Sequence, residues 1–317
     1  MTPFVDKQFL VLAGGGPKGH ILAGAIRQLD TICPNFLSNL KGVAGCSVGA
    51  LLALLIACRF PSSNILTYTS QFNMTDMMDL KPSALQQYGM DTGEKLRLAI
   101  EQILVSAFGR SNISFQELRH KTGIQLVVVA TNIDTGEAEY HGLVNSQLPV
   151  VTSVLASCSI PLVYIPVNIG GQSYVDGGMV DIFPFRVFGD MHRTLGLRFS
   201  ALGSGSLTGF KSYLYNVLTI SASKLEQLHY LSIPALYRYS NIVTFHTNDN
   251  PGLYTEPNVA ELTELGAVGI TQFIFLYSRL LIYVVGIVVS CRTARLVSER
   301  ACWTDSRSEL GSKLKLE

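Results

Sequence analysis

Residues Gly45–Gly49 read G-C-S-V-G, which fits the pattern G-x-S-x-G around a central serine, Ser47. The motif follows a short apolar segment, residues 42–45, and leads into the apolar run 50–58, so the serine stands between a predicted strand and a predicted helix. Such a turn exposes the hydroxyl, and it needs small flanking residues because larger side chains would collide with the strand and the helix. The N-terminus of the helix favours the anion that forms during acyl transfer. Ser47 is therefore a candidate nucleophile.

A carboxylate that could serve as the base is Asp176, which follows the predicted strand 173–175 and precedes Gly177 and Gly178. A residue directly after a strand lies at the carboxyl edge of a sheet, where the sites of α/β proteins collect. Asp176 could contact Ser47 there without any histidine. The alternative for an aspartate before two glycines is a simple turn, which residue statistics favour when this motif is taken alone.

A second glycine-rich turn, residues 14–19, reads G-G-G-P-K-G and lies between the apolar run 9–13 and a helical pattern over 20–29. Its G-x-G-x-x-G spacing also fits a dinucleotide-binding fingerprint. That site needs an acidic residue at the end of the second strand, where this chain has its serine motif instead. A P-loop needs Ser or Thr after its lysine, whereas Lys18 is followed by glycine. The turn predicts a row of backbone N–H groups suited to an oxyanion.

A Ser-His-Asp triad is the other way to activate Ser47. In the order found in α/β-hydrolases, Asp176 would be followed by a histidine, for which the chain offers His192, His229 and His246. That fold places several strands before its nucleophile, whereas only 46 residues precede this serine. The sequence therefore favours a Ser–Asp pair.

Hydrophobic periodicity places these motifs in an α/β domain. The run 126–130 is apolar and largely β-branched, as expected of a strand covered on both faces. The interval of residues 62–120 reads as a mainly helical insertion. Further strands are expected at 163–167, 173–175 and 195–197, and the helices of the insertion at 64–72, 93–108 and 114–120.

The composition limits the classes of function. The chain has 317 residues, of which 48% are hydrophobic and 15% charged, and its 24 basic and 23 acidic side chains give a net charge of +1. This balance argues against a nucleic-acid binder, which needs a concentrated basic surface, and against a disordered chain. The mean hydropathy of +0.30 indicates a large core, a membrane contact or both. Six scattered cysteines without a C-x-x-C pair predict neither a zinc site nor structural disulfides, which is typical of a reducing compartment.

The C-terminal region changes character twice. We expect a domain over residues 1–269, a hydrophobic helix over 270–291 and a polar tail over 292–317. The apolar stretch is long enough to span a bilayer, but Arg279 lies near its middle, where a charge is costly. A single span, an interfacial helix and a buried core helix are all open. The apolar run near the N-terminus is shorter than the core of a signal peptide, so we expect an intracellular, membrane-associated protein.

Taken together, the glycine turn, the serine motif and the D-G-G motif resemble those of the patatin-like phospholipase family and stand in the family's order. Residues 126–136 and 156–161 also look like blocks of this family, and the resemblance covers residues 8–270. Three motifs in order are far more specific than any one of them. One departure lies shortly after the D-G-G motif, where the family often has asparagine and this chain has Ile182 before Phe183 and Pro184.

The resemblance implies a three-layer α/β/α sandwich with a mainly parallel central sheet. It implies that Ser47 attacks the acyl ester of a lipid, that Asp176 takes the hydroxyl proton and later activates water, and that neither a cofactor nor a metal takes part. The implied oxyanion hole comprises Gly14, Gly15, Gly16, Lys18 and Gly19, with the N–H groups of Gly15 and Gly16 as donors; the nucleophile elbow comprises Gly45, Cys46, Val48 and Gly49, and Gly177 and Gly178 complete the D-G-G motif.

The implied activity is that of a serine esterase of the phospholipase A or lipid acyl hydrolase type. Its partners would be a phospholipid or other acyl-lipid substrate and a membrane surface, without nucleic acid. Lys18 would orient the glycine turn, meet a phosphate headgroup or lie in solvent. The alternative from a different class is a catalytically silent lipid-binding or membrane-recruited regulator with the same fold. The presence of both Ser47 and Asp176 favours the enzyme, because a silent protein has no chemical need for the pair.

Overall fold

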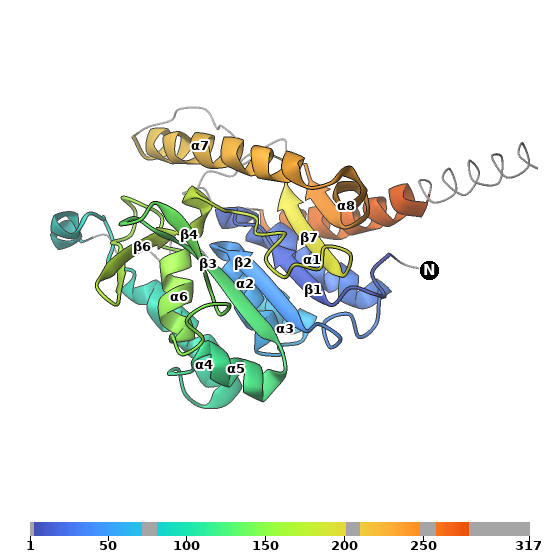
Figure 1. Cartoon of the computed structure of the whole chain (residues 1–317), viewed down its shortest axis with the longest axis horizontal. Coiled ribbons are helices and arrows are strands. Elements are labelled where there is room, and N and C mark those ends of the chain that lie inside the picture. Colours follow the sequence, from blue (N-terminus) through green and yellow to red (C-terminus); the bar gives the residue numbers. More distant parts are fainter. Residues whose placement is uncertain (1–2, 72–80, 201–209, 247–257, 279–317) are drawn as a thin grey trace, which may run out of the picture. The chain divides into compact units, whose positions relative to one another are not determined.

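The structure is a computed structural model that describes residues 3–71, 81–200, 210–246 and 258–278 (Figure 1). The chain divides into a compact unit, Met1–Thr271, and a second unit, Gln272–Glu317. The sheet and the candidate site belong to the first unit, and the description of the fold applies to it alone. The division into a domain, a hydrophobic helix and a tail stays a prediction.

One sheet of eight strands forms the centre of the first unit. Its order is β5-β6-β3-β2-β1-β7-β8, and β4 pairs with β3 outside this path. Every pair among β3, β2, β1, β7 and β8 is parallel, whereas β4, β5 and β6 join antiparallel on the β3 side. The sheet is mainly parallel, as the sequence predicts. The strands are β1 (Phe9–Leu12), β2 (Gly42–Cys46), β3 (Gln125–Asn132), β4 (Glu137–His141), β5 (Val167–Ile169), β6 (Gln172–Asp176), β7 (Thr194–Phe199) and β8 (Ile242–Phe245).

Helical segments cover both faces of the sheet. On one face, α2 packs against β1, β2 and β3, and its residues from Gly49 to Ala57 are all buried, which explains why it is apolar all round. On the other face, Phe188 stacks on Phe9 of β1, and α7 is tied to β7. The helices are α1 (Gly19–Ile32), α2 (Val48–Ala57), α3 (Ser62–Gln71), α4 (Glu94–Phe108), α5 (Phe115–Thr122), α6 (Val150–Ser157), α7 (Phe210–Ser232) and α8 (Ala235–Ser240), with 3-10 turns η1 (Gly16–Lys18), η2 (Pro82–Gln87) and η3 (Gly177–Met179).

The prediction of a strand over residues 163–167 is wrong for most of that range, because β5 begins only at Val167. Val163 and Tyr164 are buried in a loop, where the Val163 carbonyl accepts the N–H groups of Met90 and Asp91 at 3.0 and 2.9 Å. Their apolar character therefore reflects burial under a neighbouring loop and not membership of the sheet.

A C-terminal helix, Val259–Ser278, begins before the expected hydrophobic segment 270–291. By length and composition alone it could cross a membrane, which is weak evidence, and 11% of its most apolar window is buried. Within the first unit this helix crosses α1 closely, since a Cβ on Gly24 would lie 2.0 Å from the Thr263 carbonyl oxygen. The rest of the expected segment, with Arg279, and the expected tail lie outside the described residues.

Candidate active site

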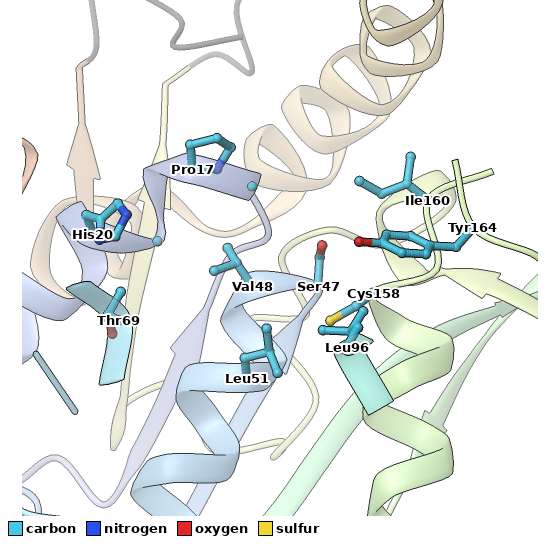
Figure 2. A pocket seen from close by; sticks show the side chains of 12 residues that line it. Pro17, His20, Ser47, Val48, Leu51, Thr69, Leu96, Cys158, Ile160 and Tyr164 are labelled. Atoms are coloured by element: carbon cyan, nitrogen blue, oxygen red, sulfur yellow. The ribbon is translucent and has the colours of Figure 1, made fainter. Parts of the chain in front are cut away.

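Ser47 occupies a strained turn between β2, which ends at Cys46, and α2, which begins at Val48. Its backbone has φ 54° and ψ −127°, a conformation that costs a non-glycine residue of order 1–3 kcal/mol. The Ser47 N–H donates to the Ser157 hydroxyl at 2.9 Å, which helps to hold the turn. Figure 2 shows the Ser47 hydroxyl pointing away from α2, on the side of Tyr164. This is the geometry that the G-x-S-x-G pattern predicts.

The two glycines of the serine motif are needed for steric reasons. A Cβ on Gly45 would lie 2.2 Å from the carbonyl oxygen of Gly49. A Cβ on Gly49 would lie 2.4 Å from the carbonyl oxygen of Leu12 in β1. Both contacts are with backbone atoms that cannot move without distorting the sheet. A side chain at position 45 would therefore push α2 away from β2, and one at position 49 would push it away from β1.

Asp176 reaches Ser47 through the strand register at the carboxyl end of β3. Cys46 of β2 lies beside Val129 of β3, and Asp176 of β6 pairs with the next residue, Ala130. The carboxylate and Ser47 line one cavity, and the serine side chain favours the ionised form of the carboxyl. The Asp176 carboxylate also accepts the N–H of Gly178 at 2.8 Å and the thiol of Cys46 at 3.7 Å. The two predicted residues thus meet, although β6 runs antiparallel to β3.

Burial determines the protonation of this carboxyl. Asp176 is 7% exposed, and its burial raises the pKa to about 6, while the hydrogen bonds from Ser47, Gly178 and Cys46 oppose that rise. A carboxylate with a pKa near neutrality is a far better proton acceptor than an ordinary aspartate, yet it is still largely ionised at pH 7. A carboxylate of this kind could act as a base for a hydroxyl group without an imidazole.

We predict that activity rises with pH through a pKa near 6 and that Cys46→Ala moves this limb to higher pH. The alanine removes a donor that favours the ionised carboxylate, so the pKa of Asp176 increases. The pH profile of kcat/KM measures the shift. Cys58→Ala, which removes another buried thiol at the far end of α2, is the control and leaves the limb in place. An unchanged limb in Cys46→Ala would contradict the assignment of Asp176 as the titrating base.

The glycine turn has two N–H groups without a backbone acceptor in the described part of the chain. The N–H of Gly14 donates to the Ile182 carbonyl at 3.0 Å, that of Lys18 to Gly15 at 3.2 Å, and that of Gly19 to Gly16 and Pro17. No backbone acceptor among the described residues receives the N–H of Gly15 or Gly16. Both glycines line a cavity with Ser47 and Asp176. Of the five residues predicted for the oxyanion hole, Gly15 and Gly16 are therefore the two whose backbone N–H groups are available as donors.

Lys18 does not lie in solvent, so the alternative of a solvated lysine is wrong. Its side chain is 1% exposed, its Nζ lies 5.6 Å from the centre of the Phe199 ring, and burial lowers its pKa to about 8. The same ring would be 2.6 Å from a Cβ on Gly15. Lys18 and Phe199 therefore support the glycine turn from inside the protein.

Two cavities meet at Ser47, and both also contain Gly16 and Ile160. The first, the Leu51 cavity, is largely apolar, and its space together with the open solvent at its mouth amounts to about 540 Å³ (Figure 2). The second, the Asp176 cavity, amounts to about 530 Å³ measured in the same way. The Leu51 cavity is further lined by Val48, Leu51, Leu96, Cys158 and Tyr164, and the Asp176 cavity by Asp176, Met179, Ile182, Leu218, Thr219 and Ala222.

Sequence reasoning missed the part of the site that α7 contributes. Leu218, Thr219 and Ala222 come from this helix, whose residues recur at helical spacing but lie far from any motif. Ile182, noted as a departure from the family pattern, also lines the Asp176 cavity, and its carbonyl holds the glycine turn through Gly14. Ile182 therefore supports the site through both its backbone carbonyl and its side chain.

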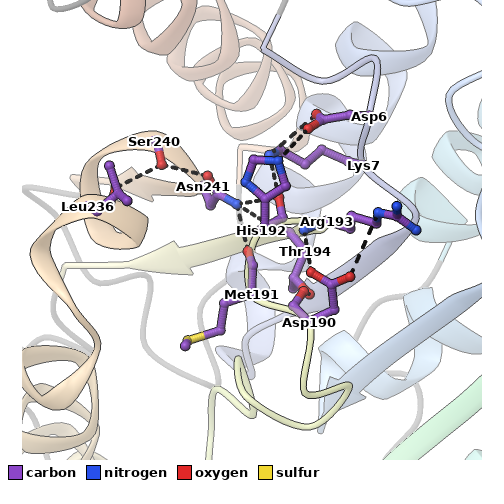
Figure 3. A network of polar contacts seen from close by, with 10 residues as sticks. All are labelled: Asp6, Lys7, Asp190, Met191, His192, Arg193, Thr194, Leu236, Ser240 and Asn241. Carbon is purple, nitrogen blue, oxygen red and sulfur yellow. Dashed lines mark hydrogen bonds and ion pairs between the residues drawn. The ribbon is translucent and has the colours of Figure 1, made fainter. Parts of the chain in front are cut away.

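The histidines considered for a triad face other partners. His192 is 73% exposed and pairs with Asp6 at 3.3 Å, in a polar network at the start of β7 (Figure 3). His229 lies 3.9 Å from Asp181, and His246 is exposed after β8. The dinucleotide alternative for the glycine turn also lacks support, since the turn faces the serine elbow. The geometry thus brings together Ser47, Asp176 and the glycine turn, and it leaves the histidines aside.

The chain is similar in sequence and in fold to several known proteins. The family model for patatin-like phospholipases matches residues 10–188. An uncharacterized protein of Acanthamoeba polyphaga mimivirus is 27% identical over 201 residues, which make up 60% of this chain. The match covers 65% of the viral protein, somewhat less than two thirds of its length. A probable lipid hydrolase of Invertebrate iridescent virus 6 is 24% identical over 252 residues, 77% of this chain and 79% of that protein.

The solved structure of VipD from Legionella pneumophila shares the fold, with a TM-score of 0.55 at 18% identity over 85% of this chain and 67% of that chain. Because the family model spans more than half of the sequence, the chain belongs to the patatin-like phospholipase family.

Proposed function

We propose that the protein is a lipid acyl hydrolase that cleaves fatty-acyl esters through Ser47 and Asp176. The observation that carries the proposal is that Ser47, at a strained turn after β2, and the buried Asp176 carboxylate line one cavity, where the serine side chain lowers the pKa of that carboxyl. Membership of the patatin-like phospholipase family and the similarity to a probable viral lipid hydrolase support an activity on lipids. The substrate is a phospholipid or another acyl lipid, presented at a membrane surface.

In the first half of the reaction, the Ser47 oxygen forms a bond with the ester carbonyl carbon and its proton passes to Asp176. The carbonyl oxygen gains the negative charge and accepts hydrogen bonds from the N–H groups of Gly15 and Gly16. When the tetrahedral intermediate collapses, the bond to the leaving oxygen breaks, and Asp176 returns the proton to that oxygen. An alcohol leaves, and the acyl group stays on Ser47.

In the second half, water replaces the alcohol. Asp176 takes a proton from water as its oxygen attacks the acyl carbon, and the same two N–H groups stabilise the oxyanion. Collapse breaks the bond to Ser47 and returns the proton to its oxygen, which releases the fatty acid. The raised pKa of Asp176 suits both directions of transfer, because the group must accept and donate a proton within one cycle.

The position of Asp176 also orients the substrate. The leaving oxygen must lie near this carboxyl to receive its proton, so the alcohol portion of the lipid occupies the Asp176 cavity. The acyl chain then extends to the other side of Ser47, into the Leu51 cavity, whose lining is largely apolar. An apolar chain gains ~0.8 kcal/mol for each methylene that it buries there.

We predict that Leu51→Phe selectively slows the hydrolysis of long acyl chains. The larger ring fills part of the Leu51 cavity, and loss of burial for about two methylenes lowers kcat/KM about tenfold. The measurement is the ratio of kcat/KM for palmitoyl and butyryl esters of one alcohol, which cancels any general loss of activity. Met179→Phe, in the Asp176 cavity, is the control and leaves this ratio unchanged. A falling ratio in Met179→Phe alone would reverse the assignment of the two cavities.

The proposed activity is tested with a fluorophosphonate, which reacts with an activated serine. We expect stoichiometric modification of the wild-type protein at Ser47, located by mass spectrometry of the peptides, together with release of fatty acid from phospholipid vesicles. A folded protein that binds vesicles but neither reacts with the probe nor releases fatty acid would contradict the proposal and favour a silent lipid-binding regulator.

A further inference from the structure

Helix α7 covers the Asp176 cavity with one face only. Leu218, Thr219 and Ala222 of this helix line the cavity, and Glu226, one turn further on, is buried in an ion pair with Arg198 of β7. These residues recur at intervals of three and four, so they occupy one side of the helix. The inner side of α7 is thereby fixed over the candidate site.

The opposite side of α7 is apolar and exposed. Its large apolar residues also recur at helical intervals and form two groups along the helix. Lys224, which is exposed, lies between these two groups. We call this set the outer face of α7. It consists of Tyr213, Val217, Ile220, Leu228 and Leu231, with exposed fractions of 52%, 46%, 54%, 65% and 54%. A continuous exposed apolar stripe on a soluble helix marks a surface that meets a membrane or a partner.

The charges of α7 favour one of these occupants. Among the α7 side chains that the structure describes, the charged one on the outer face is Lys224, while Glu226 is buried against Arg198. Helix α8, which follows α7, also exposes Leu236 and Tyr239, at 70% and 65% exposure. An apolar stripe that carries a lysine and no exposed carboxylate is complementary to lipid tails beside anionic headgroups.

We propose that the outer face of α7 docks on an anionic lipid surface and so places the Asp176 cavity beside the lipids that it takes up. The inference rests on the proposed function, because a water-insoluble substrate must travel from a lipid surface to the cavity. A single helix separates the docking face from the cavity lining, a distance of ~10 Å. The helix lies in the plane of the interface, with its apolar stripe among the acyl chains and Lys224 at the headgroups.

The test compares Ile220→Glu/Leu228→Glu with wild type on vesicles of phosphatidylcholine and phosphatidylglycerol. We expect at least a tenfold loss of co-sedimentation and of vesicle hydrolysis, whereas kcat/KM for a short-chain monomeric ester stays within about twofold of wild type, which shows that the site is intact. The matched control is Leu98→Glu, an exposed leucine on α4, which leaves co-sedimentation unchanged. Lys224→Glu weakens binding only when phosphatidylglycerol is present.

Equal co-sedimentation of the double variant and wild type would overturn the proposal. It would also be overturned by sedimentation equilibrium showing a wild-type dimer that the double variant abolishes, because the outer face would then be covered by a second copy. Vesicle binding is measured without turnover, so a protein that binds through this face but hydrolyses nothing would refute the proposed function and leave the docking face supported.

Discussion

Ser47→Ala and Asp176→Asn are each expected to lower kcat/KM for acyl esters by roughly four to six orders of magnitude. The first removes the attacking oxygen. The second keeps the shape of the side chain and its acceptor for the Gly178 N–H, but an amide cannot take the serine proton. Because the two side chains act as one unit, the double variant should be no slower than the slower single variant. Both variants should fold, since neither substitution introduces a clash.

The matched control for Asp176→Asn is Asp181→Asn. Asp181 is a second buried carboxylate, which accepts the hydroxyl of Tyr140 at 2.9 Å and lies beside His229. Its loss should reduce kcat/KM by less than about tenfold, since it takes no proton in the reaction. Steady-state kinetics with a soluble ester, together with thermal melting of each variant, separate chemistry from folding. Substantial activity in Asp176→Asn would show that another group serves as the base.

The elements around the motifs could be predicted because their signals are local. The strand before the glycine turn, the strand before Ser47 and the run 126–130 are apolar and buried on both faces, and the structure has them as β1, β2 and β3. The serine elbow follows from small residues at Gly45 and Gly49, whose clashes come from atoms close by in the chain or in the next strand. The rule that sites gather at the carboxyl edge of a parallel sheet does not explain how Asp176 comes to lie beside Ser47, because Asp176 ends β6, which runs antiparallel to β3.

The remaining elements depend on contacts between distant segments, which periodicity does not report. β4 is polar and half-buried, so it lacks the apolar run of a core strand. β8 is four residues long and is held by Asn241, whose side chain donates to the carbonyls of Met191, His192 and Thr194 at the start of β7 (Figure 3). Helix α7 has apolar residues on two sides, one that lines the cavity and one that is exposed. The sequence pattern therefore does not show which side faces the protein. The contribution of α7 to the site was therefore out of reach.

Glu226→Ala is expected to destabilise the fold by about 3–5 kcal/mol, because it leaves the Arg198 guanidinium buried without its counterion. Arg198 and Glu226 are 4% and 8% exposed, and two hydrogen bonds of 2.6 and 2.8 Å join them across β7 and α7. The arginine also lies 4.0 Å over the ring of Tyr230, so it cannot simply turn to solvent. Denaturant unfolding followed by circular dichroism measures the loss.

Removing both charges at once tests whether the ion pair itself stabilises the fold or whether apolar packing would serve equally well. Arg198→Met/Glu226→Leu replaces the pair with apolar side chains of similar volume, and its free energy of unfolding should lie close to that of wild type or above it, because two desolvation costs disappear together. A double variant as unstable as Glu226→Ala would mean that the ion pair itself stabilises the fold. In Glu226→Ala, loosening of α7 over β7 should also lower esterase activity, since Leu218 and Ala222 leave the Asp176 cavity. The same pair therefore holds both the cavity wall and the exposed outer face in position, which connects the stability of the sheet to the uptake of lipid.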